Sequence, residues 1–232
     1  MTGTAPRRVR PAVLQQRWHD ILFLHWPVDP ALAARHLPAG TRPDALDGRT
    51  FVGVIALQNA RTRVLHGPPL PWLGTYAQVN VRLYSVDEQG RRGVVFLEQH
   101  ADRLLPAVVA RSAGLPYAWH RVHLERARDR RTYTVGTPST QDAARIDVHT
   151  GTPTEPDPVE LFVTARWGLH SRLAGRTVYT GVQHPTWVLH RAELLELDGD
   201  LIAAAGLPEV TGPPESVLWS PGMDDVRIGP AA

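Results

Sequence analysis

The sequence predicts a β-rich α+β fold that forms one closed or half-closed barrel with two or three helices. The first observation is a segment that alternates polar and apolar residues over a full strand length and leads through a turn into a second strand. The second is that most of the remaining chain divides into strand-length segments at hairpin spacing, while helical patterns are few and short.

The N-terminal part supplies a tail, a short helix and a buried strand. Residues 1–12 form a basic tail, and residues 13–230 are expected to form one domain. Asp29-Pro30 predicts a helix start, with an N-cap residue followed by proline at the first helical position. The helix ends at Leu37-Pro38-Ala39-Gly40. Residues 51–57 are apolar on both faces and too short for a long helix, so they predict a buried strand.

The strand over residues 74–87 has the clearest pattern in the chain. Its apolar residues occupy one face, and its other face is polar or aromatic. Residues 88–93 predict a turn into a second strand over 94–100, which makes a hairpin. The polar and aromatic face consists of Tyr76, Gln78, Asn80, Arg82 and Tyr84.

The rest of the chain predicts two more helices and a series of strands. Residues 103–113 follow helical spacing and end at Gly114, and a second short helix is expected at 199–206. Residues 150–158 are expected to be a loop within the same domain. The predicted strands are 117–126, 131–137, 143–149, 160–170, 176–190 and a last one near 216–220.

Two amino-acid types are missing, and their absence excludes several chemistries. All 25 basic side chains are arginine, and there is no cysteine. Without lysine, no side-chain amine can form a Schiff base, hold pyridoxal phosphate or act as a phosphate-loop lysine. Without cysteine there is no thiolate nucleophile, no disulfide and no cysteine-ligated metal. The chemistry therefore depends on His, Arg, Asp/Glu, Tyr and Ser/Thr.

Charge and hydropathy narrow the class of partner to a small molecule. The net charge is only +2, and acidic residues interrupt the densest basic stretch, over 125–131, so a nucleic-acid partner is not expected. No apolar run reaches the ~20 residues of a membrane span, and no apolar segment follows the basic N-terminus, so we expect no membrane and a cytoplasmic location. The 11 histidines contain no His-x-His pair, so neither a metal nor another cofactor is predicted. A homo-oligomer remains open.

Several stretches together resemble the YqjF-like family of the acetoacetate decarboxylase-like superfamily. The resemblance covers residues 14–228. It implies a cone-shaped, mostly antiparallel β-barrel with a small-molecule pocket at its wide end. The stretches are Trp18-His19-Asp20, Leu24-His25-Trp26-Pro27-Val28-Asp29-Pro30, Leu37-Pro38-Ala39-Gly40, Asn80-Val81-Arg82-Leu83-Tyr84, Gly114-Leu115-Pro116-Tyr117, Ala205-Gly206-Leu207-Pro208 and Ser220-Pro221-Gly222-Met223-Asp224.

The resemblance does not transfer the decarboxylase activity. Those enzymes form a Schiff base through a lysine in a Gly-aromatic-Pro-Lys-Lys segment, and here the two lysine positions hold Tyr117 and Ala118. Their pocket glutamate matches Gln78, an amide that cannot exchange a proton. Their N-terminal pocket arginine matches His19, or Arg17 if the alignment shifts. Tyr117 would then either donate a hydrogen bond to a substrate oxygen or fill the space of the lysine.

The resemblance at position 78 favours a barrel interior lined by the polar face of the 76–84 strand, so Tyr76, Asn80 and Arg82 become candidate ligand contacts. Arg82 would hold an anion, because its planar five-donor cation suits a carboxylate. The alternative is an exposed arginine on a half-solvated sheet. His25, which could equally be a satisfied histidine at the barrel end, and Trp187, in His184-Pro185-Thr186-Trp187, complete the predicted pocket.

The second strand of the hairpin supplies the candidate reacting groups. Glu98 and His100 share a face with Phe96 in a regular strand, and an antiparallel hairpin would bring them beside Arg82. With Tyr117 they would form an acid–base set in which His100 moves the proton. The alternative is a buried salt-bridged network that stabilises the barrel.

The sequence is compatible with two candidate functions. One is a non-covalent acid–base enzyme of lyase or isomerase type, which catalyses dehydration, hydration, tautomerisation or cyclisation of a carbonyl or carboxylate compound. The other is a barrel that binds or senses such a ligand without chemistry. A purely structural module is less attractive, because it leaves the polar face of the strand unused.

Overall fold

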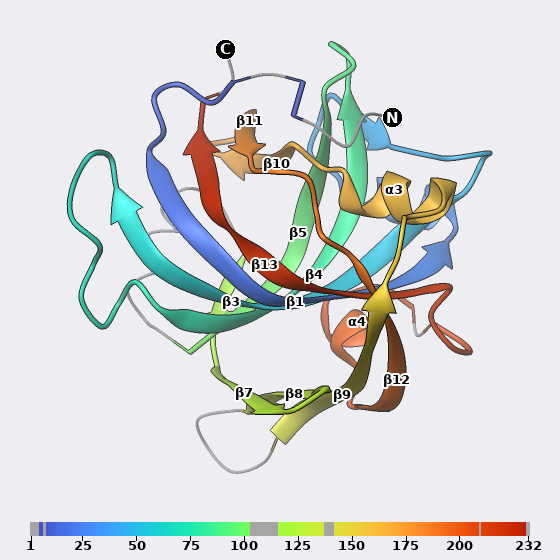
Figure 1. Cartoon of the computed structure of the whole chain (residues 1–232). Helices are drawn as coiled ribbons and strands as arrows, with labels where there is room; N and C mark the ends of the chain where they lie inside the picture. The colour runs from blue at the N-terminus through green and yellow to red at the C-terminus, as the bar shows by residue number, and fades with distance from the viewer. Residues whose placement is uncertain (1–4, 7, 103–115, 137–141, 209, 231–232) are drawn as a thin grey trace.

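The core of the molecule is a ring of seven β-strands. The computed structural model describes residues 5–6, 8–102, 116–136, 142–208 and 210–230. Strand pairing runs β1-β3-β4-β5-β10-β11-β13, and β13 pairs with β1, which closes the ring (Figure 1). The strands are β1 (Leu14–Val28), β3 (Thr50–Val64), β4 (Tyr76–Asp87), β5 (Arg92–Ala101), β10 (Gly168–Leu173), β11 (Arg176–Gln183) and β13 (Ser216–Gly229).

A second layer of strands lies against one side of the ring. The edge of β13 that pairs with β11 also pairs with β12, and from there the order is β12-β9-β8-β7. Figure 1 shows this layer below the long curved strands β1 and β3. Its strands are β7 (Arg121–Ala127), β8 (Arg130–Gly136), β9 (Asp142–Pro153) and β12 (His190–Asp198), while the short β2 (Thr41–Pro43) pairs with β4 and β6 (Tyr117–Trp119) pairs with β5.

Three short helices accompany the sheet in the described part of the chain: α1 (Pro30–Ala34), α3 (Pro158–Thr164) and α4 (Leu201–Ala204). The predicted start at Asp29-Pro30 is confirmed, because the Asp29 carboxylate accepts a hydrogen bond from the Ala31 backbone at 2.7 Å. The predicted helix near 199–206 is confirmed as α4. The predicted helix over 103–113 lies outside the described residues.

The sequence prediction was wrong in several places. The loop expected over 150–158 is shorter, because β9 extends to Pro153. Residues 160–170 do not form one strand, because α3 covers their first half and β10 begins only at Gly168. The strand expected over 176–190 ends at Gln183, and β12, which the sequence pattern did not predict, begins at His190. The last strand is longer than expected and extends to Gly229.

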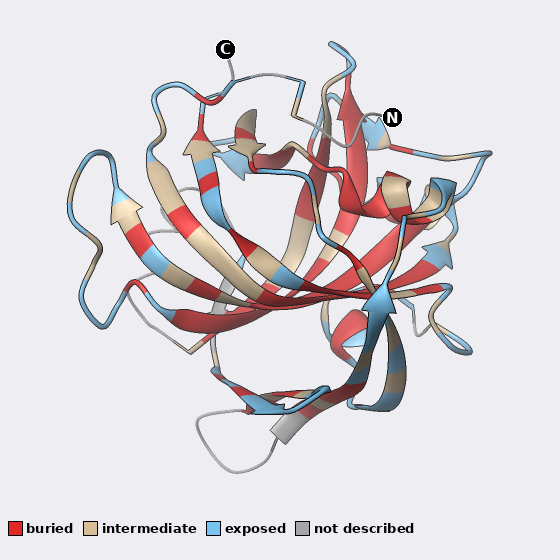
Figure 2. Cartoon of the chain, in the orientation of Figure 1, coloured by how far each residue is buried: buried red, intermediate tan, exposed pale blue. Residues whose placement is uncertain are grey.

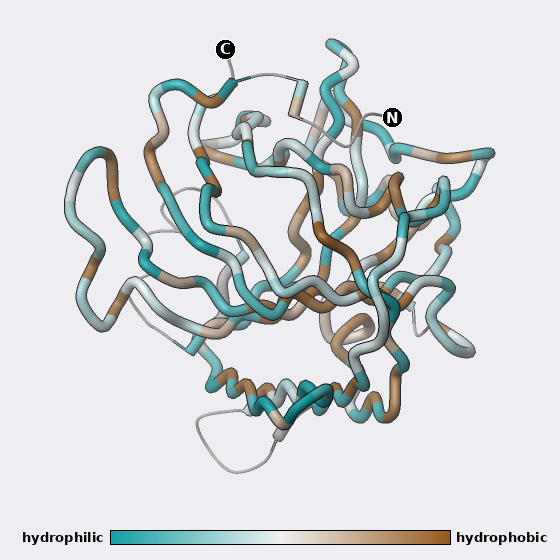
Figure 3. Tube along the Cα trace, in the orientation of Figure 1, coloured by the Kyte–Doolittle hydropathy of each residue, from teal (hydrophilic) through white to brown (hydrophobic). Residues whose placement is uncertain are grey.

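Strands β1, β3, β4 and β5 each have an outer face toward the second layer and an inner face toward the centre of the ring. Leu24, Val54 and Val81 of the outer face pack with Tyr133 and Ile146 of the second layer in the largest apolar cluster. Figure 2 shows that burial continues along the curved strands on both faces. Figure 3 shows hydrophilic and hydrophobic residues interspersed along the same strands.

Candidate functional site

The inner face of β4 carries the polar residues that the alternation predicts. Tyr76, Gln78 and Asn80 are buried there and Arg82 is half-buried, while the alternate apolar residues pack in the outer-face cluster. Tyr84 completes the face and packs with Phe162 of α3 in an inner cluster. The hairpin pairing of β4 and β5 is confirmed.

A ladder of side-chain amides crosses the inner face. Asn59 Nδ2 donates to Gln78 Oε1 at 3.0 Å, and Gln78 Nε2 donates to Gln99 Oε1 at 3.0 Å. Asn80 lies directly opposite Gln99 across the β4–β5 pair. Gln99 Nε2 and Asn80 Oδ1 are buried and have no hydrogen-bond partner among the described residues. A donor and an acceptor that are both buried and unpaired cost about 1–3 kcal/mol each, which a polar ligand or water would offset.

Arg82 provides a cation beside these amides. Its Nε donates to the Tyr84 hydroxyl at 3.2 Å and its Nη2 donates to the Val163 carbonyl at 3.1 Å. The guanidinium lies 6.0 Å from the Phe23 ring centroid. Within the described ranges no carboxylate forms an ion pair with it. Neutral groups therefore fix the position of the guanidinium, and its positive charge is available to an anion.

His25 and Tyr84 form a buried pair behind Arg82. His25 Nε2 lies 2.6 Å from the Tyr84 hydroxyl. Burial, and then the charges of Arg82 and Arg166, lower the pKa of His25 well below its usual value, so the imidazole is neutral near pH 7. Because Arg82 donates to the Tyr84 oxygen, the Tyr84 proton can point to His25 Nε2. His25 Nδ1 then carries the imidazole proton, and it has no partner in the described structure.

An ionic network lies at the α3 end of the inner face. Arg92 donates to both oxygens of Asp44 at 2.7 Å, and Arg166 also bonds to this carboxylate. The Arg166 guanidinium lies 4.7 Å from the Tyr84 ring centroid and 4.2 Å from that of Phe162. Burial lowers the pKa of Arg166 to about 10. The network fixes the aromatic rings that support Arg82.

An aromatic cluster covers another part of the inner face. Trp18, Trp167 and Trp187 are half-buried and surround His184, with ring centroids 5.9, 4.3 and 4.7 Å from the imidazole. Burial lowers the pKa of His184 to about 4, so this imidazole is also neutral. Trp187 packs edge-on against Phe23 with centroids 5.1 Å apart.

Glu98 and His100 do not lie on the inner face, which corrects the expectation from the sequence. Glu98 pairs with Val81 and His100 with Val79, both of which are outer-face residues. The cause is a β-bulge: Arg82 pairs with Phe96, so Leu97 is an extra residue that packs against the outer cluster. The bulge places Phe96 and Glu98 on opposite faces although they are two residues apart.

Between the two layers, Glu98 and His100 form a separate cluster with His120. His100 Nδ1 lies 2.6 Å from His120 Nδ1, and His100 Nε2 lies 3.6 Å from Glu98 Oε2. Burial raises the pKa of Glu98. Burial, followed by the charge of His120, lowers the pKa of His100 to about 4. This arrangement is closer to the alternative of a buried polar network than to a set around a ligand of Arg82.

Of two other predicted site residues, the structure describes the side chain of His19 but only the backbone of Tyr117. His19 lies on the outer face, because it pairs with Gln58, whose side chain bonds to Arg126 of the second layer; its expected place in the pocket is therefore corrected. Tyr117 pairs with Gln99 through the backbone, which brings β6 alongside the amide ladder. The side chain of Tyr117 lies outside the described part of the structure.

Sequence reasoning missed Gln99, His184 and Trp18 as parts of the inner face. Gln99 was assigned to the opposite face by the same alternation that misplaced Glu98. The signal for His184 was available, because it begins the motif that identified Trp187. Trp18 stacks on Trp187 with a centroid distance of 6.0 Å, a contact between segments far apart in sequence that no local pattern indicates.

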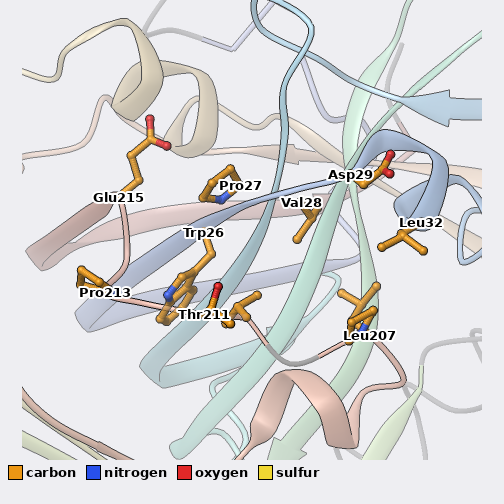
Figure 4. Close-up of a pocket in the computed structure, with 11 residues that line it drawn as sticks. Trp26, Pro27, Val28, Asp29, Leu32, Leu207, Thr211, Pro213 and Glu215 are labelled. Atoms are coloured by element: carbon orange, nitrogen blue, oxygen red, sulfur yellow. The ribbon is translucent and has the colours of Figure 1, made fainter.

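A hollow lies outside the ring, between the end of β1 and the segment after α4 (Figure 4). It has a volume of about 420 Å³ and is lined mainly by apolar residues such as Trp26 and Leu207. The two carboxylates at this hollow already have partners, because Asp29 caps α1 and Glu215 pairs with Arg49 at 2.9 Å. It therefore offers fewer unpaired polar groups than the inner face.

The described residues contain no group of three or more His, Cys, Asp or Glu side chains arranged to hold a metal ion. None of their helices has the length and apolar character needed to cross a membrane.

Comparison with known proteins identifies the family. A family model, DUF2071, described as an uncharacterized conserved protein, matches residues 15–224. The chain belongs to the DUF2071 family. A relative of this DUF2071 chain is the uncharacterized protein YqjF of Bacillus subtilis (strain 168), which is 25% identical over 186 residues, 78% of this chain and 76% of the relative. The resemblance found in the sequence is confirmed.

Solved structures show which fold the DUF2071 chain has. The enduracididine biosynthesis enzyme MppR with bound HEPES buffer superposes with a TM-score of 0.64 at 17% identity, over 94% of this chain and 86% of that one. An acetoacetate decarboxylase-like enzyme from Sphingomonas wittichii RW1 gives a TM-score of 0.64 at 16% identity, over 95% and 92%. MppR has also been solved with pyruvate (TM-score 0.62, 18% identity, 93% and 90%). The chain therefore has the acetoacetate decarboxylase-like fold that the sequence predicted.

Proposed function

We propose that the inner face of the ring binds a small carbonyl-containing carboxylate, with Arg82 holding the carboxylate group. The observation that carries the proposal is the half-buried Arg82 guanidinium, which has only neutral partners in the described residues. A cation held in this way gains an ion pair when an anion arrives, and the desolvated surroundings strengthen that pair. The pyruvate bound by MppR, a protein of the same fold, agrees with this ligand class.

The neighbouring amides suit the other polar atoms of such a ligand. Gln99 Nε2 can donate to a carbonyl oxygen, and Asn80 Oδ1 can accept from a hydroxyl group. Gln78 contacts both ends of the ladder and fixes the orientation of Gln99. Tyr76, on the same face of β4, accepts from Gln16 Nε2 at 3.3 Å, and Gln16 in turn accepts from Trp18 Nε1.

The reaction that fits this site best is non-covalent acid–base chemistry of lyase or isomerase type. No side-chain amine exists for an imine, since the chain has no lysine. Tautomerisation, hydration or dehydration needs only a held carboxylate, a polarised carbonyl and a proton carrier. His25 and Tyr84 are the proton-bearing pair beside Arg82, and Tyr117, whose backbone adjoins Gln99, remains the candidate for polarising the substrate oxygen.

A ligand-binding protein without catalysis is the second candidate. It is favoured by the position of Glu98 and His100 between the two layers, which removes them as reacting groups at Arg82. The two candidates separate in one measurement. The enzyme is expected to accelerate exchange of deuterium from D₂O into the methyl group of pyruvate, followed by NMR, and Arg82→Met is expected to abolish the acceleration. Binding of pyruvate without accelerated exchange would assign the second function.

Replacement of Arg82 tests the ligand class directly. Arg82→Met keeps much of the side-chain volume and removes all five donors, so pyruvate binding should weaken by about 2–4 kcal/mol. Arg42→Met, on the exposed surface of β2, is the matched control and should bind like the wild type. Isothermal titration calorimetry with pyruvate, and with acetone as the uncharged analogue, gives the result. Equal affinity of the two variants for pyruvate would contradict the proposal.

A further inference from the structure

We infer that the ligand of this site carries a planar aromatic or conjugated group, which stacks on the indole rings of Trp18 and Trp187. The inference rests on the proposed function and extends it from a small carboxylate to an aromatic or conjugated 2-oxo acid. It starts from a feature that the proposed function leaves unused. Three half-buried tryptophans surround one neutral histidine on the inner face, whereas holding a carboxylate requires none of them.

Phe23 connects the tryptophans to the anion site. The Arg82 guanidinium lies 6.0 Å from the Phe23 ring centroid, and the Trp187 ring lies 5.1 Å from the same centroid. Both groups thus border one phenylalanine ring. The charge of Arg82 also contributes to the lowered pKa of His184, which agrees with this proximity. A molecule whose carboxylate reaches Arg82 therefore has its other end within reach of Trp187.

The N–H groups of the two indole rings are already paired, so a ligand would meet only the apolar ring surface that their mutual stacking and His184 leave uncovered. Trp187 Nε1 donates to the Thr164 carbonyl at 3.0 Å, and Trp18 Nε1 donates to Gln16 Oε1 at 3.1 Å. Their planes differ by only 12°. Since both polar atoms are already paired, the exposed parts of the rings offer a flat apolar surface that suits offset stacking.

The charges on the inner face favour a neutral ring over a cationic group. Indole faces also attract cations, so an ammonium group is the competing possibility. Arg82 is positive and close by, and two described carboxylates near α3 are already paired, Asp44 with Arg92 and Arg166, and Glu160 with Arg191. His184 adds no negative charge. A cation would be repelled by Arg82 without an anion to offset the repulsion, whereas a neutral conjugated ring meets no such cost.

The test compares phenylpyruvate, 3-cyclohexylpyruvate and pyruvate by isothermal titration calorimetry. The wild type should bind phenylpyruvate about tenfold more tightly than pyruvate, and more tightly than the cyclohexyl acid, which has similar bulk but no aromatic face. Trp187→Leu should remove most of this preference, so that the ratio of the phenylpyruvate affinity to the pyruvate affinity falls towards one. Trp72→Leu is the matched control, because Trp72 is 88% exposed, and it should keep the wild-type preference.

The outcomes separate this inference from the proposed function. If pyruvate binding requires Arg82 but phenylpyruvate binds no more tightly, or if Trp187→Leu keeps the preference, the inference is overturned and the proposed function stands. If neither acid binds, or if Arg82→Met binds both like the wild type, both are overturned. Should Trp187→Leu fail to fold, Trp18→Leu replaces the other ring of the stacked pair and is expected to show the same loss of preference.

Discussion

The two faces of the β4–β5 hairpin carry polar groups of opposite character. On the inner face, Asn80 and Gln99 lie beside an arginine that has only neutral partners in the described structure. On the outer face, Glu98 and His100 lie between two sheets, and their close contacts are with each other and with His120. The inner arrangement leaves a cation and hydrogen-bonding atoms for a ligand. The outer arrangement also leaves Glu98 Oε2 and His100 Nε2 without a hydrogen-bond partner in the described structure, but it has no arginine that lacks a carboxylate partner.

One extra residue separates these two regions. Leu97 forms a β-bulge, so the residues on either side of it lie on opposite faces of the sheet. Without the bulge, either Glu98 and His100 or Phe96 would have to change faces. The face on which a side chain of β5 lies therefore depends on the pairing of the strand as much as on its sequence.

Deletion of single residues tests the bulge and has the largest expected effect on the free energy of unfolding. Deletion of Leu97 should leave every other residue of β5 on its present face and cost about 1–3 kcal/mol, from the lost burial of one leucine. Deletion of Val81 should abolish folding, because β4 pairs regularly with β3 and the deletion inverts one part of the strand. Chemical denaturation measures both. Comparable losses in the two variants would show that Leu97 is an ordinary strand residue.

Acid stability tests the outer cluster. The pKa of His100 is about 4 in the folded protein and about 6.5 when unfolded, so the unfolded chain binds the extra proton between these values. The contribution of neutral His100 to the free energy of unfolding is fully present above pH 6.5. It is lost as the pH decreases to 4, by about 3 kcal/mol in total. His100→Gln should therefore reduce the slope of unfolding free energy against pH in this window.

The control for this prediction is His123→Gln, since the His123 side chain is 70% exposed, and its slope should match the wild type. His184→Gln extends the measurement to the inner face, because burial lowers the pKa of His184 to about 4 as well. It should reduce the slope in the same window. An unchanged slope in His100→Gln would mean that His100 is already protonated, or solvated, in the folded protein.

The sequence was sufficient to predict the β4–β5 hairpin and the residues on the inner face of β4. The alternation over β4 is regular, and the inward direction of Arg82, Gln78 and Asn80 followed from it together with the family resemblance. The bulge had no such signal, because Phe96, Leu97 and Glu98 fit a regular strand as well as a bulged one. The position of Trp18 over Trp187 depends on ring closure, which only the tertiary structure determines.

The error at α3 had a readable signal. Residues 158–164 contain β-branched and aromatic residues, which favour a strand. The preceding Asp157-Pro158 and the later Glu160 are a capping box with proline at the first helical position, and the structure contains both of its hydrogen bonds, at 2.8 and 2.9 Å. Local capping thus outweighed β-propensity at α3, whereas at Asp29-Pro30, where the helix was predicted correctly, the Ala and Leu residues that follow favour a helix as well.

The most direct test of the central claim is to compare the two faces of the hairpin in one binding experiment. The affinity for pyruvate is measured by isothermal titration calorimetry for Arg82→Met and for the double variant Glu98→Gln/His100→Gln, with folding checked by circular dichroism. If the inner face is the ligand site, Arg82→Met loses at least about 2 kcal/mol of binding free energy, while the double variant binds like the wild type. Loss of binding in the double variant, with Arg82→Met unaffected, would contradict the account and move the site to the outer face.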